Sequence, residues 1–322
     1  MTILYAGTSV ADFAIGGGTS LVTDATHLSP YVAEGVRLDG PASAKTGLFG
    51  PVSDLWVGFM LHVWDAAFGE GIRFYNSIGA TVFSLEFSGF SDYGFELNIF
   101  NGSRTEAVGL SPKSLAQDST ERVDIHIKID DVAGEFNVYL DGLLLVGFSG
   151  DTNRSADNAI VSVGWMSDDN SLEYDISAVI VADTDTRGMI FAQSKPTTNG
   201  ARSDWTGDAT DIDDLGRDDT NFIKSGTDGH VSTFGVGTLP AGLSGWDVHA
   251  VVVAGRALVG DDTTLDKVVR VGSTNYLSGD VGAGGIMGPV QHVFHQNPAT
   301  AADWTFAEVD AIEVGVKLGI TA

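Results

Sequence analysis

Glu173 and Asp175 are the two residues whose types and spacing come nearest to catalytic chemistry in this chain. They stand two positions apart in a run of strand-like residues, so both carboxylates are expected on the same face. A glycosidase built on a β-sandwich uses such a row, with one acid as nucleophile and another as proton donor. Here the next position on that face is Ser177, so the row stops. We therefore interpret this pair as an ordinary solvated strand face and predict no catalytic residue; polysaccharide hydrolysis that is lost in Glu173→Gln would indicate the opposite.

Asp211, Asp213 and Asp214 lie in one of several oxygen-rich loops and resemble the opening of a calcium-binding loop. Leu215 stands where such a loop needs an oxygen ligand, and Phe222 replaces its closing Glu, so the motif is not an EF-hand. The alternative is an acidic turn without a metal. These three carboxylates are our candidate metal ligands, and structural calcium is the only cofactor that the sequence suggests.

The histidines give no comparable motif. His292 and His295 are three apart, which on a strand places them on opposite faces and prevents them from sharing a metal ion. The chain has no cysteine, which excludes disulfides, thiolate nucleophiles and cysteine-bound zinc.

Aromatic residues could instead contact a glycan. Trp56, Trp64, Trp165 and the Phe- and Tyr-rich stretch 83–100 are the candidates for a sugar-stacking surface. The alternative, which we favour for most of them, is that they fill the core of a sandwich. The sequence by itself leaves the glycan-binding residues unknown.

The formal net charge of −26 limits the partners of the protein. Nucleic acids and anionic lipids are bound by clustered Lys and Arg, whereas the 17 basic residues here are scattered singly. No apolar run reaches the roughly 18 residues that span a bilayer. The first residues lack the basic region of a signal peptide and read as a short strand. We expect no nucleic-acid binding and no membrane insertion.

The secondary structure expected from the sequence is almost entirely β. Residues 123–129 alternate strictly between apolar and polar, which is the pattern of a half-buried antiparallel strand. Asp141 and Gly142 then supply a hairpin turn that accepts positive φ. Further strands are expected at residues 3–6, 36–38, 55–63, 71–76, 81–87, 95–100, 136–140, 143–146, 160–165 and 174–181. Many short strands without crossover helices predict an antiparallel two-sheet sandwich over residues 1–193.

Residues 194–203 are polar and contain the proline and glycine of a linker, so we place the domain boundary there. A second, smaller β-rich domain is expected over residues 204–322, with strands at 221–224, 231–236, 246–254, 268–271, 291–295 and 311–318. The capping-box spacing from Thr305 to Glu308 predicts one short helix.

The first region resembles a laminin-G/concanavalin-like jelly roll. The residues that carry the resemblance are the three runs 123–129, 134–142 and 174–181, in which a strand ending in Tyr-x-Asp-Gly precedes a closing strand. The resemblance implies a fold more than a ligand, because many members bind glycans and many only build surfaces.

The second region resembles a C-terminal module of tailed-bacteriophage virion proteins that accompany such a jelly roll. The matching segments are 204–206, 218–223, 248–254, 297–300 and 303–308. The resemblance implies a non-enzymatic structural protein of the virion surface, in a tail fibre or tip or as a head spike or decoration, assembled in the host cytoplasm. Its implied partners are other virion proteins, further copies of itself (a homotrimer) and host surface glycans. The alternatives are a free carbohydrate-binding module and a jelly-roll glycoside hydrolase or lyase.

Overall fold

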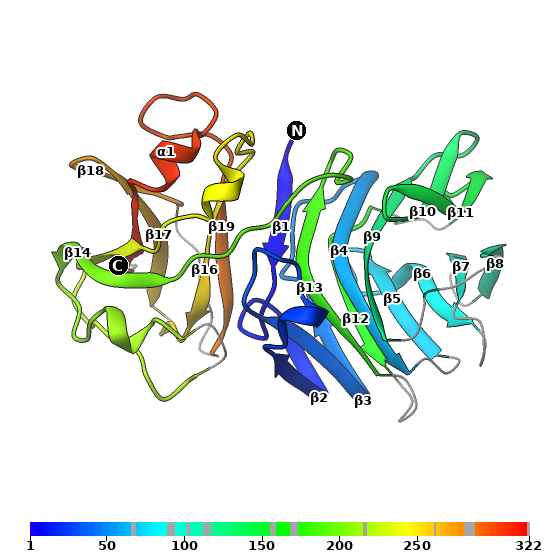
Figure 1. Ribbon diagram of the computed structural model, residues 1–322, viewed down its shortest axis with the longest axis horizontal. Helices are drawn as coiled ribbons and strands as arrows, with labels where there is room; N and C mark the ends of the chain where they lie inside the picture. The colour runs from blue at the N-terminus through cyan, green and yellow to red at the C-terminus, as the bar shows by residue number, and fades with distance from the viewer. Residues whose placement is uncertain are drawn as a thin grey trace. The chain divides into compact units, whose positions relative to one another are not determined.

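The structure is a computed structural model, and it describes residues 1–65, 69–88, 94–101, 104–111, 115, 118–154, 159–167, 173–214, 218–260, 262–279 and 287–320. The protein is all-β, with antiparallel pairing throughout the described strands, as the sequence predicts (Figure 1). It divides into two compact units, Met1–Phe191 and Ala192–Ala322. In the described part of the chain, no helix is long and apolar enough to cross a membrane.

The first unit is a sandwich of thirteen described strands. They are β1 (Ile3–Gly7), β2 (Ala14–Val22), β3 (Gly35–Lys45), β4 (Asp54–Asp65), β5 (Gly69–Tyr75), β6 (Thr81–Ser88), β7 (Gly94–Asn101), β8 (Arg104–Leu110), β9 (Ser119–Lys128), β10 (Gly134–Leu140), β11 (Leu143–Gly150), β12 (Ser162–Ser167) and β13 (Glu173–Ala182). A 3₁₀ turn, η1 (Ala25–His27), lies between β2 and β3. Asp141 and Gly142 both have positive φ in the β10–β11 hairpin, which confirms the predicted turn.

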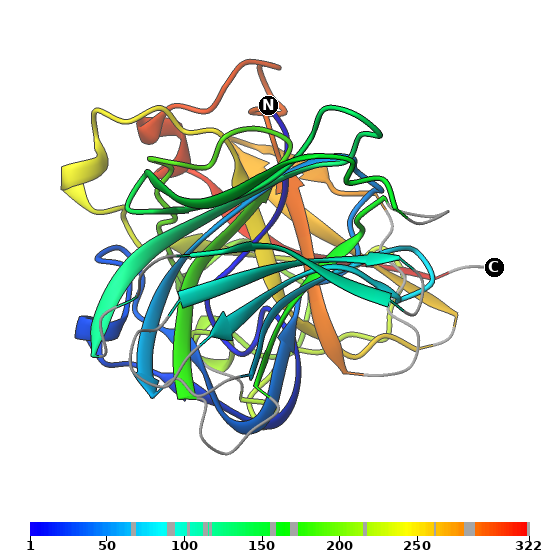
Figure 2. The same cartoon turned by 90° about the vertical axis from the view of Figure 1, so that its right-hand side faces the viewer.

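Strand β3 belongs to both layers of this sandwich. Its first half pairs with β13 and its second half with β12. Gly40, with a φ of 66°, lies between the two halves, where the left-handed backbone needs a residue without Cβ. One layer therefore runs β11-β10-β9-β4-β13-β3 and the other β3-β12-β5-β6-β7-β8. The strands twist and curve as they cross the unit (Figure 2).

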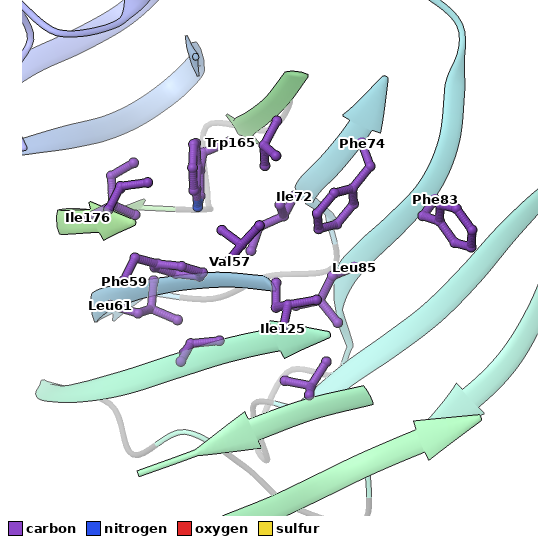
Figure 3. Close-up of a cluster of buried hydrophobic side chains, with 14 of the residues drawn as sticks. Val57, Phe59, Leu61, Ile72, Phe74, Phe83, Leu85, Ile125, Trp165 and Ile176 are labelled. Carbon is purple, nitrogen blue, oxygen red and sulfur yellow. The ribbon is translucent and has the colours of Figure 1, made fainter. Parts of the chain in front are cut away.

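The core lies between these layers and follows the alternation in the sequence. Val123, Ile125 and Ile127 of β9 point inward and are fully buried. Trp165 of β12 packs edge-on against Phe59 of β4, with ring centroids 5.6 Å apart (Figure 3). Trp165 is completely buried, so for this tryptophan the core interpretation is confirmed.

The second unit is built from a five-stranded and a two-stranded antiparallel sheet. Its elements are β14 (Pro196–Ser203), η2 (Ala209–Asp211), β15 (Val231–Val236), η3 (Ala241–Leu243), β16 (Val251–Ala257), β17 (Thr263–Val271), β18 (Thr274–Leu277), β19 (Gly288–Phe294), α1 (Phe306–Val309) and β20 (Glu313–Ile320). The predicted capping box is present at α1: the Glu308 carboxylate accepts from the Thr305 backbone, and the Thr305 hydroxyl accepts from the Glu308 backbone.

Two predictions for this region need correction. The segment predicted as a linker, residues 194–203, contains strand β14, which pairs with β15 at the edge of the five-stranded sheet. Its polar, exposed side chains do not prevent pairing, because an edge strand needs only its backbone groups and tolerates a proline at its first residue. Residues 221–224, predicted as a strand, form only a single bridge, between Lys224 and Thr206.

Candidate functional site

Glu173 and Asp175 do lie on one face of β13, as their spacing predicts, but Asp175 is not available to a substrate. Its carboxylate accepts two hydrogen bonds from Arg37, of 2.8 and 3.0 Å, and one of 2.9 Å from Trp64 Nε1. The Asp175 side chain is fully buried, and Arg37 also reaches Glu173 at 3.2 Å. The hydrogen bonds to Asp175 raise the pKa of Arg37. Asp175 is thus buried and Glu173 is partly exposed, so the interpretation as a solvated strand face is wrong for Asp175.

The chain itself covers this face of the sheet. Residues 24–34 cross it, with the Thr26 carbonyl accepting from the Thr120 hydroxyl at 2.7 Å and the Ser29 amide donating to the Ser177 hydroxyl at 3.2 Å. His27, in the same segment, is buried against the sheet. The face that the acidic pair marks is therefore closed.

A second segment, which follows β13, covers the neighbouring strands β4, β9 and β10. The Thr186 hydroxyl donates to the buried carboxylate of Asp124 at 2.7 Å. The Arg187 guanidinium lies 4.3 Å from the ring centroid of Tyr139 and 5.2 Å from that of Trp56. Trp56 is almost fully buried, so it is not an exposed sugar-stacking residue.

The calcium candidates have protein partners of their own. The Asp211 carboxylate accepts from the Asp208 amide in a capping box, and Asp213 lies 3.5 Å from Lys195 Nζ. Residues 215–217 of the motif lie outside the described residues. The described part of the chain brings together no group of three His, Asp or Glu side chains that could hold a metal ion. Calcium binding at Asp211, Asp213 and Asp214 stays a prediction.

The outer face of the layer β3-β12-β5-β6-β7-β8 carries charged and polar side chains. We call it the β12–β7 face; it carries Lys45, Arg73, Tyr75, Ser84, Glu86, Glu96, Asn98, Ser162 and Met166. The strand register aligns five of its residues in one row that crosses the strands. In order from β3 to β7, these are Lys45, Gly164, Arg73, Ser84 and Asn98. The charged side chains of this row are half-exposed.

Tyr75 anchors one end of the β12–β7 face. Its ring lies over Gly164, where a Cβ would stand only 3.0 Å from the ring, and the Lys45 ammonium lies 3.8 Å from the ring centroid. Burial lowers the pKa of Lys45 and raises the pKa of Tyr75. Because one side of the ring faces the strand and Lys45 caps it, Tyr75 positions a cation and is not itself a stacking platform.

The β12–β7 face contains buried polar atoms that have no hydrogen-bond partner among the described residues. Among them are Nδ2 of Asn98, a residue that is 2% exposed, and Oγ of Ser162, which is fully buried. Buried polar groups in native proteins nearly always have a partner, so these two atoms mark a part of the face where the described residues leave hydrogen-bonding capacity unused.

Glu86 and Glu96 are the acidic residues of the same face and stand directly opposite each other on β6 and β7. Ser84 donates to Glu86 at 3.0 Å. The face thus combines cationic, hydroxyl, amide and carboxylate groups, which is the chemistry that recognises sugar hydroxyls and carboxylates.

The polar residues of this face form no recognisable motif in the sequence, although four of them lie within the aromatic-rich stretch 83–100. The signal was present, since Arg73, Ser84 and Asn98 each alternate with core residues in a predicted strand. That alternation says which side a residue occupies but not which strands are neighbours, so the row across strands could not be seen.

Comparisons with known proteins give likeness in structure only. No protein-family model matches the sequence, and no curated protein matches it either. Among solved structures, the globular domain of T. cruzi calreticulin is similar at 12% identity, over 57% of this chain and 89% of that chain, with a TM-score of 0.42. An endo-β-1,4-glucuronan lyase from the fungus Trichoderma reesei is similar at 12% identity, over 58% and 98%, with a TM-score of 0.43. A carbohydrate-binding module from Bacillus subtilis is similar at 11% identity, over 55% and 94%, with a TM-score of 0.34. At this identity and these TM-scores, the likenesses say nothing about a ligand.

Proposed function

We propose that this protein is a non-enzymatic surface protein whose first unit binds a glycan through the β12–β7 face. The observation that carries the proposal is the buried Asn98 amide without a partner, in one row with Lys45, Arg73 and Ser84. A buried donor that lacks an acceptor costs about 1–3 kcal/mol. Because Nδ2 of Asn98 has almost no accessible surface in the free protein, the half-exposed side chains of the face must move for a sugar hydroxyl or carboxylate to supply that acceptor. Arg73, two strands away in the same row, would donate to the same sugar.

A glycan array probed with the full chain tests this proposal. We expect binding to a defined set of glycans by the wild-type protein, and loss of that binding in Asn98→Leu. Asn137→Leu is the matched control, because Asn137 lies on the other layer, where its amide donates to Glu135 at 2.9 Å. An array without any bound glycan, or binding that Asn98→Leu retains in full, would refute the glycan proposal.

A glycoside hydrolase or lyase is the second candidate function, and Glu86 and Glu96 favour it. They stand directly opposite each other on antiparallel strands, so two carboxyl groups extend from neighbouring positions of one face, and a pair of carboxyl groups is what most glycosidases use. Release of new sugar ends from a bound polysaccharide, abolished in Glu86→Gln or Glu96→Gln, would establish this candidate over the non-enzymatic one. Binding without any release would reject it.

We further propose that the protein acts on the surface of a tailed-phage virion, as a tail or head component. Support for this part comes from the sequence resemblance of the second region, and none of the solved structures named above is a virion protein. Immunogold labelling of particles with an antibody against the chain tests it. Labelled particles, with labelling lost on deletion of residues 204–322, are the expected result; unlabelled particles from cells that make the protein would overturn it.

A further inference from the structure

His27 and His62 form a stacked pair between the covering segment 24–34 and the sheet below it. Their ring centroids are 3.9 Å apart, the rings are 24° from parallel, and both side chains are almost fully buried. The Trp64 ring packs edge-on against both. His27 belongs to the segment and His62 to β4, so the stack is a direct contact between the two.

The hydrogen bonds of Thr120 fix the proton on His62. The Thr120 hydroxyl donates its only hydrogen to the Thr26 carbonyl, so it can only accept from His62 Nδ1, which lies 3.0 Å away. Neutral His62 then has its proton on Nδ1 and a bare lone pair on Nε2. That Nε2 has no hydrogen-bond partner among the described residues and lies 3.6 Å from the Asp118 carboxylate. A proton at Nε2 is therefore the one change that acid brings to this ring.

His27 is surrounded by carboxylates. Its Nδ1 lies 3.3 Å from Asp175 and its Nε2 lies 3.9 Å from Asp24. Asp175 is already paired with Arg37, which also pairs with Glu173. The charged groups that face the two rings are thus Asp24 from the segment, Asp118 from the chain before β9, Asp175 from β13 and Arg37 from β3.

Two charged imidazoles in this stack would repel each other at the distance of the rings. In agreement, burial and the charge of His27 lower the pKa of His62, although Asp175 and Asp118 act in the opposite direction. When segment 24–34 lifts off, both rings enter water, and His62 recovers an ordinary pKa near 6.5. The open form of the segment therefore binds more protons than the closed form below that pH.

We propose that the His27–His62 stack is an acid-sensitive latch that holds segment 24–34 on the sheet at neutral pH and releases it when His62 is protonated. The sign of this pH dependence follows from linkage between protonation and closure. A histidine whose pKa is lowered in the closed form stabilises that form at pH values above its open-form pKa. This stabilisation is lost as the pH falls from 6.5 towards the lower value. Release would expose the face that carries Arg37, His62 and Asp175.

Hydrogen exchange of the full chain between pH 8 and 5, corrected for intrinsic rates, tests the latch. The Ser29 amide reports on it directly, because it donates to Ser177 on the sheet. Its protection is expected to fall by up to about tenfold for each pH unit below 6.5, until the lowered pKa of His62 is reached. Amides of the β4–β9 ladder, such as that of Ile125, serve as the internal reference and should keep their protection.

Two variants decide whether the histidines cause the effect. His62→Phe keeps a ring in the stack but removes the imidazole whose pKa burial lowers, so its segment should lose the pH dependence. Asp118→Asn removes a carboxylate that raises the pKa of His62, at an exposed position with a φ of 61° that Asn accepts. It should enlarge the acid effect. His249→Gln, an exposed histidine of the second unit, is the control. Protection of Ser29 that is constant with pH in the wild type, or an unchanged pH dependence in His62→Phe, would overturn the proposal.

Discussion

Arg37 and Asp175 face each other on the adjacent antiparallel strands β3 and β13, and the guanidinium donates two hydrogen bonds to the carboxylate. The Asp175 side chain is fully buried, while that of Arg37 is 28% exposed. This pair accounts for the acidic motif of β13: Asp175 is a structural anchor between strands, held further by Trp64. It also explains why the face with the most conspicuous acids is not the face we propose for ligand binding.

Removal of Asp175 should strongly destabilise the first unit. We expect Asp175→Ala to lower the free energy of unfolding by about 3–5 kcal/mol, because it removes the buried acceptor of two hydrogen bonds from Arg37 and one from Trp64. Glu173→Gln, at a side chain that is 33% exposed, should cost about 0–1 kcal/mol. Urea unfolding of the full chain, followed by near-ultraviolet circular dichroism, measures both. Equal effects of the two substitutions would show that the buried ion pair has no special role.

Asn98 should be more important for binding than for stability. In Asn98→Leu the unpaired amide is replaced by an apolar group of similar size, so we expect the free energy of unfolding to be unchanged or raised. The affinity for the glycan should fall roughly three- to tenfold, the equivalent of one hydrogen bond of about 1 kcal/mol. Titration calorimetry measures the affinity of this variant for the glycan, and urea unfolding measures its free energy of unfolding. A clear loss of stability would mean that the amide has a partner in the free protein.

Lys267 should make the stability of the second unit depend on alkaline pH. On β17 it lies on the same face as Leu265 and Val269, which both belong to hydrophobic clusters, and burial lowers its pKa to about 8 from 10.5. The unfolded chain therefore binds more protons between these values, and stability rises with pH across this window. Below pH 8 the buried, charged lysine lowers the free energy of unfolding by about 3 kcal/mol relative to its value above pH 10.5.

Lys267→Met should remove that cost and therefore stabilise the protein at pH 7. The measurement is the free energy of urea unfolding of the wild type and the variant, at pH 7 and at pH 10.5. Lys224→Met, at an exposed position, controls for the loss of one positive charge. If Lys267→Met destabilises the protein at pH 7, the ammonium has a compensating partner.

Gly315 should not tolerate a side chain. It lies on β20 between β15 and β17, and a Cβ there would stand 2.0 Å from the Ser232 carbonyl oxygen. Since backbone must move to relieve that contact, Gly315→Ala is expected to cost about 1–3 kcal/mol. Gly255 on β16 has open space around its Cβ position, so Gly255→Ala should be neutral. Thermal unfolding of the two variants compares them, and similar melting temperatures would contradict the steric argument.

Chelation tests the predicted calcium site and the predicted trimer together. If Asp211, Asp213 and Asp214 bind calcium, chelator should lower the melting temperature of the wild type, because a ligand of the folded state stabilises it. The double variant Asp213→Asn/Asp214→Asn should then be insensitive to chelator. Light scattering after size-exclusion chromatography, with calcium and with chelator, gives the oligomeric state. A wild-type protein indifferent to chelator would leave these residues as an acidic turn.

Local structure follows closely from the sequence in this protein. The alternation of residues 123–129, the Asp141-Gly142 turn and the Thr305–Glu308 capping box all occur as predicted. The shared face of Glu173 and Asp175 does as well. These features depend on backbone geometry over a few residues, so the residue types and their spacing determine them. Strand β2 was missed because its run of glycines hides the alternation on which strand prediction rests.

The partners of these elements were decided only by the tertiary structure. Arg37 and Asp175 are 138 residues apart in the chain, and no local pattern indicates that β3 and β13 are neighbours. The same holds for the row from Lys45 to Asn98, for the covering of the acidic face by residues 24–34 and for the burial of Lys267. The sequence by itself determined which side of its strand each residue occupies. Which strands lie beside each other, and which face the chain then covers, depend on contacts between distant segments that only the folded chain brings together.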